Sequence, residues 1–188
     1  MNLNTAALDN TRGTLLGNTA LVINATGDVN NTSGLVAAQN VNIHAQGWNN
    51  SQGKLVSTQG DLSLNTSQNA VTNTSGLIQS AQDLRLMAEG TANALQNSQG
   101  KIMAARDASL STGAITNTAG LIAAGRNLSI NTHDQSLSNA GSRSASTGPV
   151  LGLIAGKQLD ITSGTVDNRA GLISAQNALN ITSSGGLN

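Results

Sequence analysis

Three aspartates of this chain, Asp61, Asp83 and Asp107, recur at similar intervals, and each directly precedes an apolar-x-apolar pair. Carboxylates stacked in this way could bind a hard cation such as Ca²⁺, which takes several oxygen ligands. They could also line the acidic cleft of an enzyme that cleaves polysaccharides. We favour a structural role, because Asp is a common turn residue and three arginines lie close enough in register to compensate the charge. These arginines are Arg85, Arg106 and Arg126.

Other chemistry-bearing residues give no catalytic pattern. His44 and His133 lie in different repeats, without a carboxylate or a second histidine at the spacing of a metal site. No serine lies in the Gly-x-Ser-x-Gly motif of a nucleophile elbow. We therefore expect a protein that is not an enzyme and that has no cofactor.

The charge balance limits the classes of partner. Nine basic and nine acidic residues give no net charge, and no run of either sign occurs, which argues against nucleic acid or anionic lipid as a partner. Cysteine is absent, so no disulfide or thiolate metal site can form. No apolar run approaches the roughly 20 residues needed to span a bilayer, and no signal peptide opens the chain.

A motif close to Asn-x-x-Gly-x-[Ile/Leu/Val]-x-[small] recurs about every 20 residues and is followed by an apolar-x-apolar pair. Seven copies keep both the asparagine and the glycine. The asparagines are Asn10, Asn31, Asn50, Asn73, Asn97, Asn117 and Asn168. The glycines are Gly13, Gly34, Gly53, Gly76, Gly100, Gly120 and Gly171. An eighth, irregular copy begins at residues 137–141.

Each repeat contains three apolar clusters in which the apolar residues alternate with others. A spacing of two is the period of a strand and not of a helix, so we expect three short strands per repeat. Stacking about eight such repeats gives an all-β, right-handed parallel β-helix that forms one domain over residues 1–188. We expect the asparagines to form a hydrogen-bonded ladder, and each motif glycine to take a positive φ at a corner.

Two surfaces are candidates for partner binding. An insertion at about residues 142–151 interrupts the eighth copy and should form a loop, with candidate contact residues Ser142, Arg143, Ser144, Ser146, Thr147 and Pro149. The second feature is the pair of positions beside the second apolar cluster. One position holds Leu35, Leu77, Leu121 and Leu172, and the other holds Leu16, Val56, Met103 and Ile154. These side chains either point outward as a broken apolar stripe or turn inward at the corner.

The residue pattern of the repeat, clearest at residues 117–130, resembles the filamentous haemagglutinin repeats of bacterial two-partner-secreted exoproteins. That family includes surface adhesins and contact-dependent inhibition proteins that carry a toxin. The resemblance implies a secreted, cell-surface shaft exported through an outer-membrane transporter, here an internal segment of a longer protein that presents a binding or toxin-bearing end to target cells. The resemblance also allows the alternative that this segment is a region of the filament that binds a receptor or glycan on a host or neighbouring cell.

The ends of the array have no evident cap. Solenoids normally cover their open ends, because unpaired strand edges and apolar cross-sections are exposed there. Either the ends of this segment associate with another copy, or the segment persists without such protection.

Overall fold

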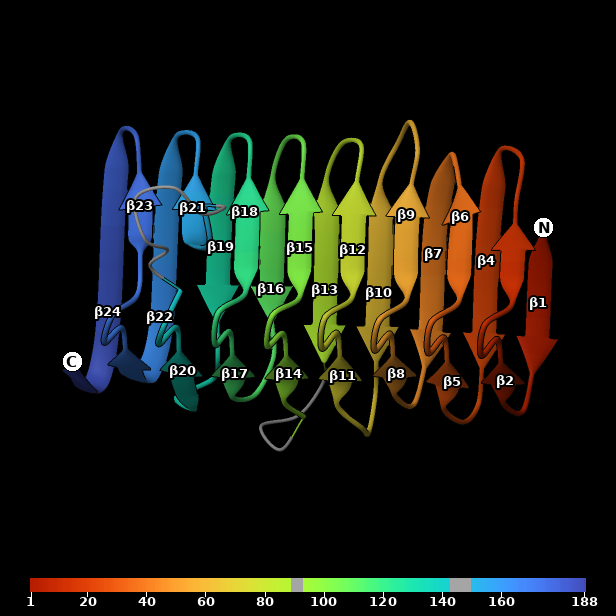
Figure 1. Ribbon diagram of the computed structural model, residues 1–188, viewed down its shortest axis with the longest axis horizontal. Coiled ribbons are helices and arrows are strands. Elements are labelled where there is room, and N and C mark those ends of the chain that lie inside the picture. Colours follow the sequence, from red (N-terminus) through yellow and green to blue (C-terminus); the bar gives the residue numbers. More distant parts are fainter. Residues whose placement is uncertain (89–92, 143–149) are drawn as a thin grey trace.

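The computed structural model describes residues 1–88, 93–142 and 150–188 and contains 24 strands. The strands pair in parallel with the corresponding strands of the neighbouring repeats, so the chain winds into a solenoid (Figure 1). This confirms the all-β parallel architecture of about eight coils.

Each coil has three faces, which we name A, B and C in chain order. Face A consists of β1 (Asn2–Thr5), β4 (Ala20–Ala25), β7 (Asn40–Ala45), β10 (Leu62–Thr66), β13 (Leu84–Ala88), β16 (Ala108–Ser111), β19 (Asn127–Asn131) and the first parts of β22 (Gln158–Asp167) and β24 (Ala178–Leu187). Face B consists of β2 (Leu8–Asp9), β5 (Val29–Asn30), β8 (Trp48–Asn49), β11 (Val71–Thr72), β14 (Leu95–Gln96), β17 (Ile115–Thr116), β20 (Ser136–Ser138) and the second parts of β22 and β24. Face C consists of β3 (Thr14–Leu16), β6 (Leu35–Ala38), β9 (Lys54–Ser57), β12 (Leu77–Ser80), β15 (Lys101–Ala104), β18 (Leu121–Ala124), β21 (Gly152–Ala155) and β23 (Ile173–Ala175).

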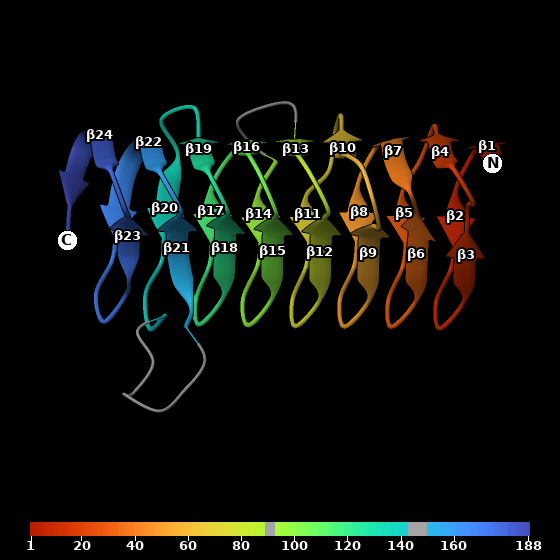
Figure 2. The ribbon, with the colours of Figure 1, turned by 90° about the horizontal axis from the view of Figure 1, so that it is seen from above.

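Two sheets result from this pairing. Face C is an 8-stranded sheet, whereas faces A and B join into a 16-stranded sheet because β22 pairs with both β19 and β20. Faces A and C are the broad faces and lie on opposite sides of the shaft (Figure 2). A ligand or partner can therefore contact one broad face without contacting the other.

The three predicted apolar columns point inward and form the core. On face A the buried pair continues from Leu62 and Leu64 to Leu84 and Leu86 in the next coil. Faces B and C each add one large side chain per coil, such as Val71 and Ile78, both with no exposed surface. Because every coil repeats this alternation, the core is continuous along the shaft.

The motif glycines do not have the positive φ that we expected, so that prediction was wrong. The positive φ occurs one residue earlier, at Arg12, Ser33, Gln52, Ser75, Gln99, Ala119 and Ala170. The glycines are needed for space: a Cβ on Gly34, Gly53, Gly76, Gly100, Gly120 or Gly171 would lie 2.0–2.4 Å from the carbonyl oxygen of the preceding ladder asparagine. Close approach of one backbone to the next, rather than φ, therefore selects glycine.

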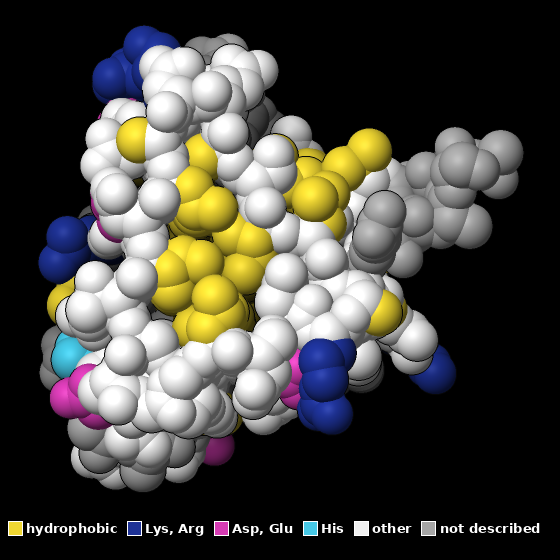
Figure 3. All heavy atoms as spheres, turned by 90° about the vertical axis from the view of Figure 1, so that its left-hand side faces the viewer, with side chains coloured by type: hydrophobic (Ala, Val, Ile, Leu, Met, Phe, Trp, Pro, Cys, Tyr) yellow, Lys and Arg dark blue, Asp and Glu magenta, His cyan; other side chains and the backbone are white. Residues whose placement is uncertain are grey.

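The C-terminal end of the shaft exposes its apolar interior. Hydrophobic side chains fill the centre of this end (Figure 3), where 46% of Leu179 and 57% of Leu187 are exposed. Ile173 and Ile181 are only partly buried there. At the opposite end, Leu3 and Leu8 are likewise partly buried. Within the described residues, no segment caps either end.

Candidate functional site

The three aspartates stack at the start of successive face A strands, as their spacing predicts. One oxygen of each accepts a hydrogen bond from the backbone N–H at the same position in the next coil. Asp61 Oδ1 accepts from Asp83 N at 3.1 Å, and Asp83 Oδ1 accepts from Asp107 N at 3.2 Å. Asn40 extends this column on one side, and Asn127 on the other. The carboxylates thus hold neighbouring coils in register.

Two of the three predicted arginines compensate the column. Arg106 Nε lies 3.3 Å from Asp83, and Arg126 Nη2 lies 3.5 Å from Asp107. The prediction for Arg85 was wrong, because its Nε donates to the sulfur of Met87 on the same strand at 3.0 Å. Arg85 extends outward from the middle of its strand and not from the turn, so its guanidinium reaches along the strand.

A shallow groove of about 520 Å³ follows the aspartate column across the outer surface of face A. It crosses five strands from β10 to β22, and its lining includes Ser63, Ser109 and Asp160. A second groove of about 220 Å³ shares Asp61 and Ser63 and extends across β4 and β7. Together they form a channel parallel to the shaft axis.

The three aspartates share one hydrogen-bonding pattern but differ in their charged neighbours. Here each aspartate accepts the same backbone N–H bond, and two have an arginine beside them. Among the described residues, no group of three or more His, Cys, Asp or Glu side chains could hold a metal ion.

The two histidines lie in different coils, four strands apart on face A. His44 is in β7, and His133 follows β19. The ring of His133 is held by Thr112 O at 3.0 Å from Nδ1 and by Ser111 Oγ at 3.3 Å from Nε2. These contacts give His133 a role in packing one coil on the next.

Two carboxyl groups with lowered pKa values lie on face B, far from the groove. Hydrogen bonds from the hydroxyl and N–H of Thr11 lower the pKa of Asp9. Arg169 donates to Asp167 from its side chain and from its N–H, which lowers the pKa of Asp167 to about 2. Both perturbations arise within turns of a single coil, as in ordinary Asx turns.

The asparagine ladder is the most regular polar feature of the interior. Each Nδ2 donates to the Oδ1 of the next asparagine at 2.7–2.8 Å, always toward the C-terminal end. Six members have no exposed surface: Asn31, Asn50, Asn73, Asn97, Asn117 and Asn139. The sequence motif missed Asn139, because its coil has Ser142 at the glycine position. The spacing of 22 residues from Asn117 could have revealed it.

Comparison with known families agrees with this periodic interior. A sequence model of the haemagglutinin repeat matches residues 1–33, 23–91, 59–142 and 132–188. The chain belongs to the haemagglutinin repeat family. No curated protein and no solved structure matches it.

The haemagglutinin repeat is a structural repeat of filamentous adhesins and implies a secreted or surface-exposed protein. No helix among the described residues has the length and apolar character needed to cross a membrane. The family match indicates that the chain is a length of adhesin-type shaft.

The insertion interrupts the haemagglutinin repeat between two consecutive positions of one coil. Ser142 is where other coils have the motif glycine, and Gly152 is where they begin the face C strand. Ser142 is fully buried, and its hydroxyl donates to Asn139 O and accepts from Leu172 N, each at 3.0 Å. This corrects its assignment as a partner-binding residue. The other candidates, Arg143, Ser144, Ser146, Thr147 and Pro149, lie outside the described residues.

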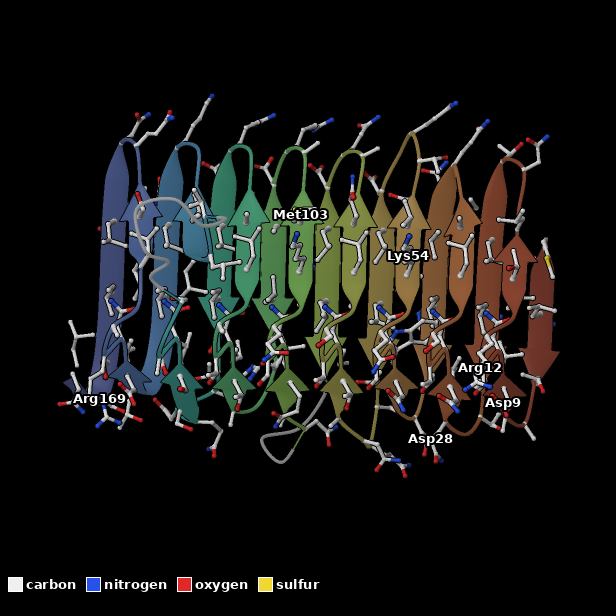
Figure 4. The ribbon with its side chains drawn as sticks, viewed as in Figure 1. Asp9, Arg12, Asp28, Lys54, Met103 and Arg169 are labelled. Atoms are coloured by element: carbon white, nitrogen blue, oxygen red, sulfur yellow. The ribbon has the colours of Figure 1, made fainter. Side chains whose placement is uncertain are left out.

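The apolar positions beside the second cluster point outward from face C. On β6, β12 and β18, half-buried Leu35, Leu77 and Leu121 alternate with fully buried inward residues. Lys54 and Lys101 lie between these leucines in the same column, each paired with a leucine on both sides. Figure 4 shows Lys54 and Met103 on this face. The apolar stripe is therefore at the surface, interrupted by lysines.

Proposed function

We propose that this chain is a shaft segment of a secreted, cell-surface filamentous exoprotein and holds a binding or toxin-bearing end away from the producing cell. An outer-membrane transporter would export the full-length protein. The supporting observation is the unbroken register: the asparagine ladder joins every coil from Asn10 to Asn168.

The physical basis of this function is rigidity. Every coil forms backbone hydrogen bonds with the next on three faces, and the buried amides add a fourth line of contacts. Bending the shaft must strain several of these bonds at once, and each coil adds about 4.8 Å of reach. A shaft with this architecture therefore keeps its two ends at a fixed separation over a long distance.

Removing one coil in register tests the proposal in the full-length protein on its native cells. Deletion of residues 50–72 joins Asn49 to Asn73, so the ladder and all three faces continue. We expect normal surface display and retained target-cell binding, because the shaft is only shortened. Deletion of residues 50–60, which removes about half a coil, is the matched control and should abolish display. Loss of target binding with display intact in the one-coil deletion would contradict a shaft role.

A second candidate is a receptor- or glycan-binding region, which the groove along face A favours. Ser63 and Ser109 lie in one column on either side of Arg85, and Asp83 lies in the neighbouring aspartate column. Ser109→Trp would fill the groove and should weaken target-cell binding if this face contacts a glycan. Ser138→Trp on face B is the control.

The insertion is tested by a separate deletion. Removing residues 143–151 joins Ser142 directly to Gly152, as Gly120 joins Leu121, and preserves the buried hydroxyl. Unchanged target-cell binding would exclude the insertion as the receptor contact.

The enzyme alternative predicts that Asp61→Ala, Asp83→Ala or Asp107→Ala abolishes cleavage of a polysaccharide. No cleavage by the parent chain across a glycan panel would eliminate this alternative.

A further inference from the structure

The fold separates surface side chains that are mixed along the sequence. Large apolar residues point outward on face C in nearly every coil: Leu16, Leu35, Val56, Leu77, Met103, Leu121, Ile154 and Leu172. The outward residues of face B are all polar, and those of face A include only Val22 and Met87 as large apolar residues. Leu16, at 62% exposed, is on face C, and Val150, at 65%, lies two residues before the start of β21.

The charges are separated in the same way. None of the described carboxylates is on face C. They occur on face A (Asp61, Asp83, Asp107 and Asp160), on face B (Asp9 and Asp167) and in the turns between them (Asp28 and Asp134). Face C has Lys54 and Lys101, both exposed, and within the described residues neither forms an ion pair.

We infer that face C docks on an anionic phospholipid surface. Apolar side chains combined with lysines and no carboxylates are the composition of interfacial membrane-binding surfaces. The two lysines are two coils apart, about 10 Å along the shaft, so both ammonium groups reach one flat layer of phosphates. The leucines beside them are half-buried, so they insert shallowly and the binding is weak and reversible.

A second copy fits this face less well. Eight strands of up to four residues give a face of about 450 Å², below the roughly 800 Å² per partner of a stable protein interface. Face C against itself would oppose lysines to lysines. Face A is a weak counter-surface, because two of its four carboxylates, Asp83 and Asp107, are already paired with Arg106 and Arg126.

Co-sedimentation with vesicles tests the inference. Vesicles of equal parts phosphatidylcholine and phosphatidylglycerol should bind the chain, whereas vesicles of phosphatidylcholine alone should not. Removing each lysine charge should lower the partition coefficient about fivefold, equivalent to about 1 kcal/mol, so Lys54→Gln/Lys101→Gln should lower it about 25-fold. Leu77→Gln/Leu121→Gln should also weaken binding with both lysines intact.

The matched control is Arg85→Gln/Arg106→Gln, which removes the same charge from the side of face A and should leave binding unchanged. All substituted positions are at the surface, and circular dichroism verifies that each variant is folded. No binding to the anionic vesicles, an equal loss in the control, or unchanged binding of the leucine variant would overturn the inference. Self-association without vesicles that the leucine variant removes would also overturn the inference, because the occupant of face C would then be a second copy.

Discussion

Replacing a central asparagine of the ladder should destabilise the shaft far more than replacing a terminal one. Asn73 has no exposed surface and takes part in four hydrogen bonds. Its Oδ1 accepts from Asn50 at 2.8 Å, and its Nδ2 donates to Asn97 Oδ1 at 2.7 Å, Lys101 O at 3.1 Å and Gly76 O at 3.3 Å. Asn73→Ala removes all four bonds.

The loss of stability follows from the buried polar atom that remains without a hydrogen-bond partner. Asn50 Nδ2 keeps its bonds to Gly53 O and Leu77 O, but Asn97 Oδ1 loses its ladder donor in the buried interior. An unsatisfied buried acceptor costs about 1–3 kcal/mol, and each lost hydrogen bond about 0.5–1.5 kcal/mol. These contributions overlap, so we expect Asn73→Ala to lower the free energy of unfolding by about 4 kcal/mol. Asn73→Asp should be worse, because it buries a carboxylate facing Asn97 Oδ1.

Asn168→Ala is the matched control at the C-terminal end. Asn168 is only half-buried and accepts one ladder bond, from Asn139, whose Nδ2 still reaches Leu172 O at 2.8 Å. Its loss should therefore cost about 1 kcal/mol. Urea unfolding followed by circular dichroism and by Trp48 fluorescence measures both values, and coincident transitions justify a two-state analysis. Equal costs at Asn73 and Asn168 would refute the argument that the buried ladder stabilises the coils.

Three further substitutions test separate features of the fold. Gly76→Ala should lower the free energy of unfolding in urea by about 3 kcal/mol or more, because the added Cβ would overpack the backbone of the preceding coil. Gly141 has φ +67 and open space around it, so Gly141→Ala should lower it by only about 1 kcal/mol. Similar losses for the two variants would contradict the steric explanation. Arg169→Ala should return the pKa of Asp167 from about 2 toward 3.8 in an NMR titration. Because the native value is lowered, this carboxylate favours the folded state above pH 4, and the contribution is lost as the pH falls toward 2; an unchanged pKa would exclude Arg169 as the cause. Trp48 is buried, and its Nε1 has no hydrogen-bond partner. Trp48→Phe should therefore lower the free energy of unfolding by less than half of the 3–5 kcal/mol expected for Trp48→Ala. Equal losses of stability would show that indole packing alone matters.

The candidate site was only partly predictable from the sequence. The spacing of Asp61, Asp83 and Asp107 correctly placed them in one column, because residues at equal positions of consecutive coils must stack. It did not show that each carboxylate accepts the N–H of the next coil, nor that Arg85 bonds along its own strand. Those outcomes depend on side-chain directions, which the period of the repeat leaves undetermined.

The sequence by itself determined the strands, their register and the ladder, since a period of two within strands and about 20 between coils permits only one stacking of the apolar columns. Tertiary structure decided why the motif position is glycine, because the close approach of consecutive coils leaves no room for a Cβ there, while the positive φ occurs at the residue before it. It also decided the surface chemistry. The chain is neutral and has no charge run, yet coil closure brings Lys54 and Lys101 into one column with Leu35, Leu77 and Leu121 and places the described carboxylates on other faces. Net charge is a sum over residues, whereas a face is defined by residues about 20 positions apart that only the folded coil brings together.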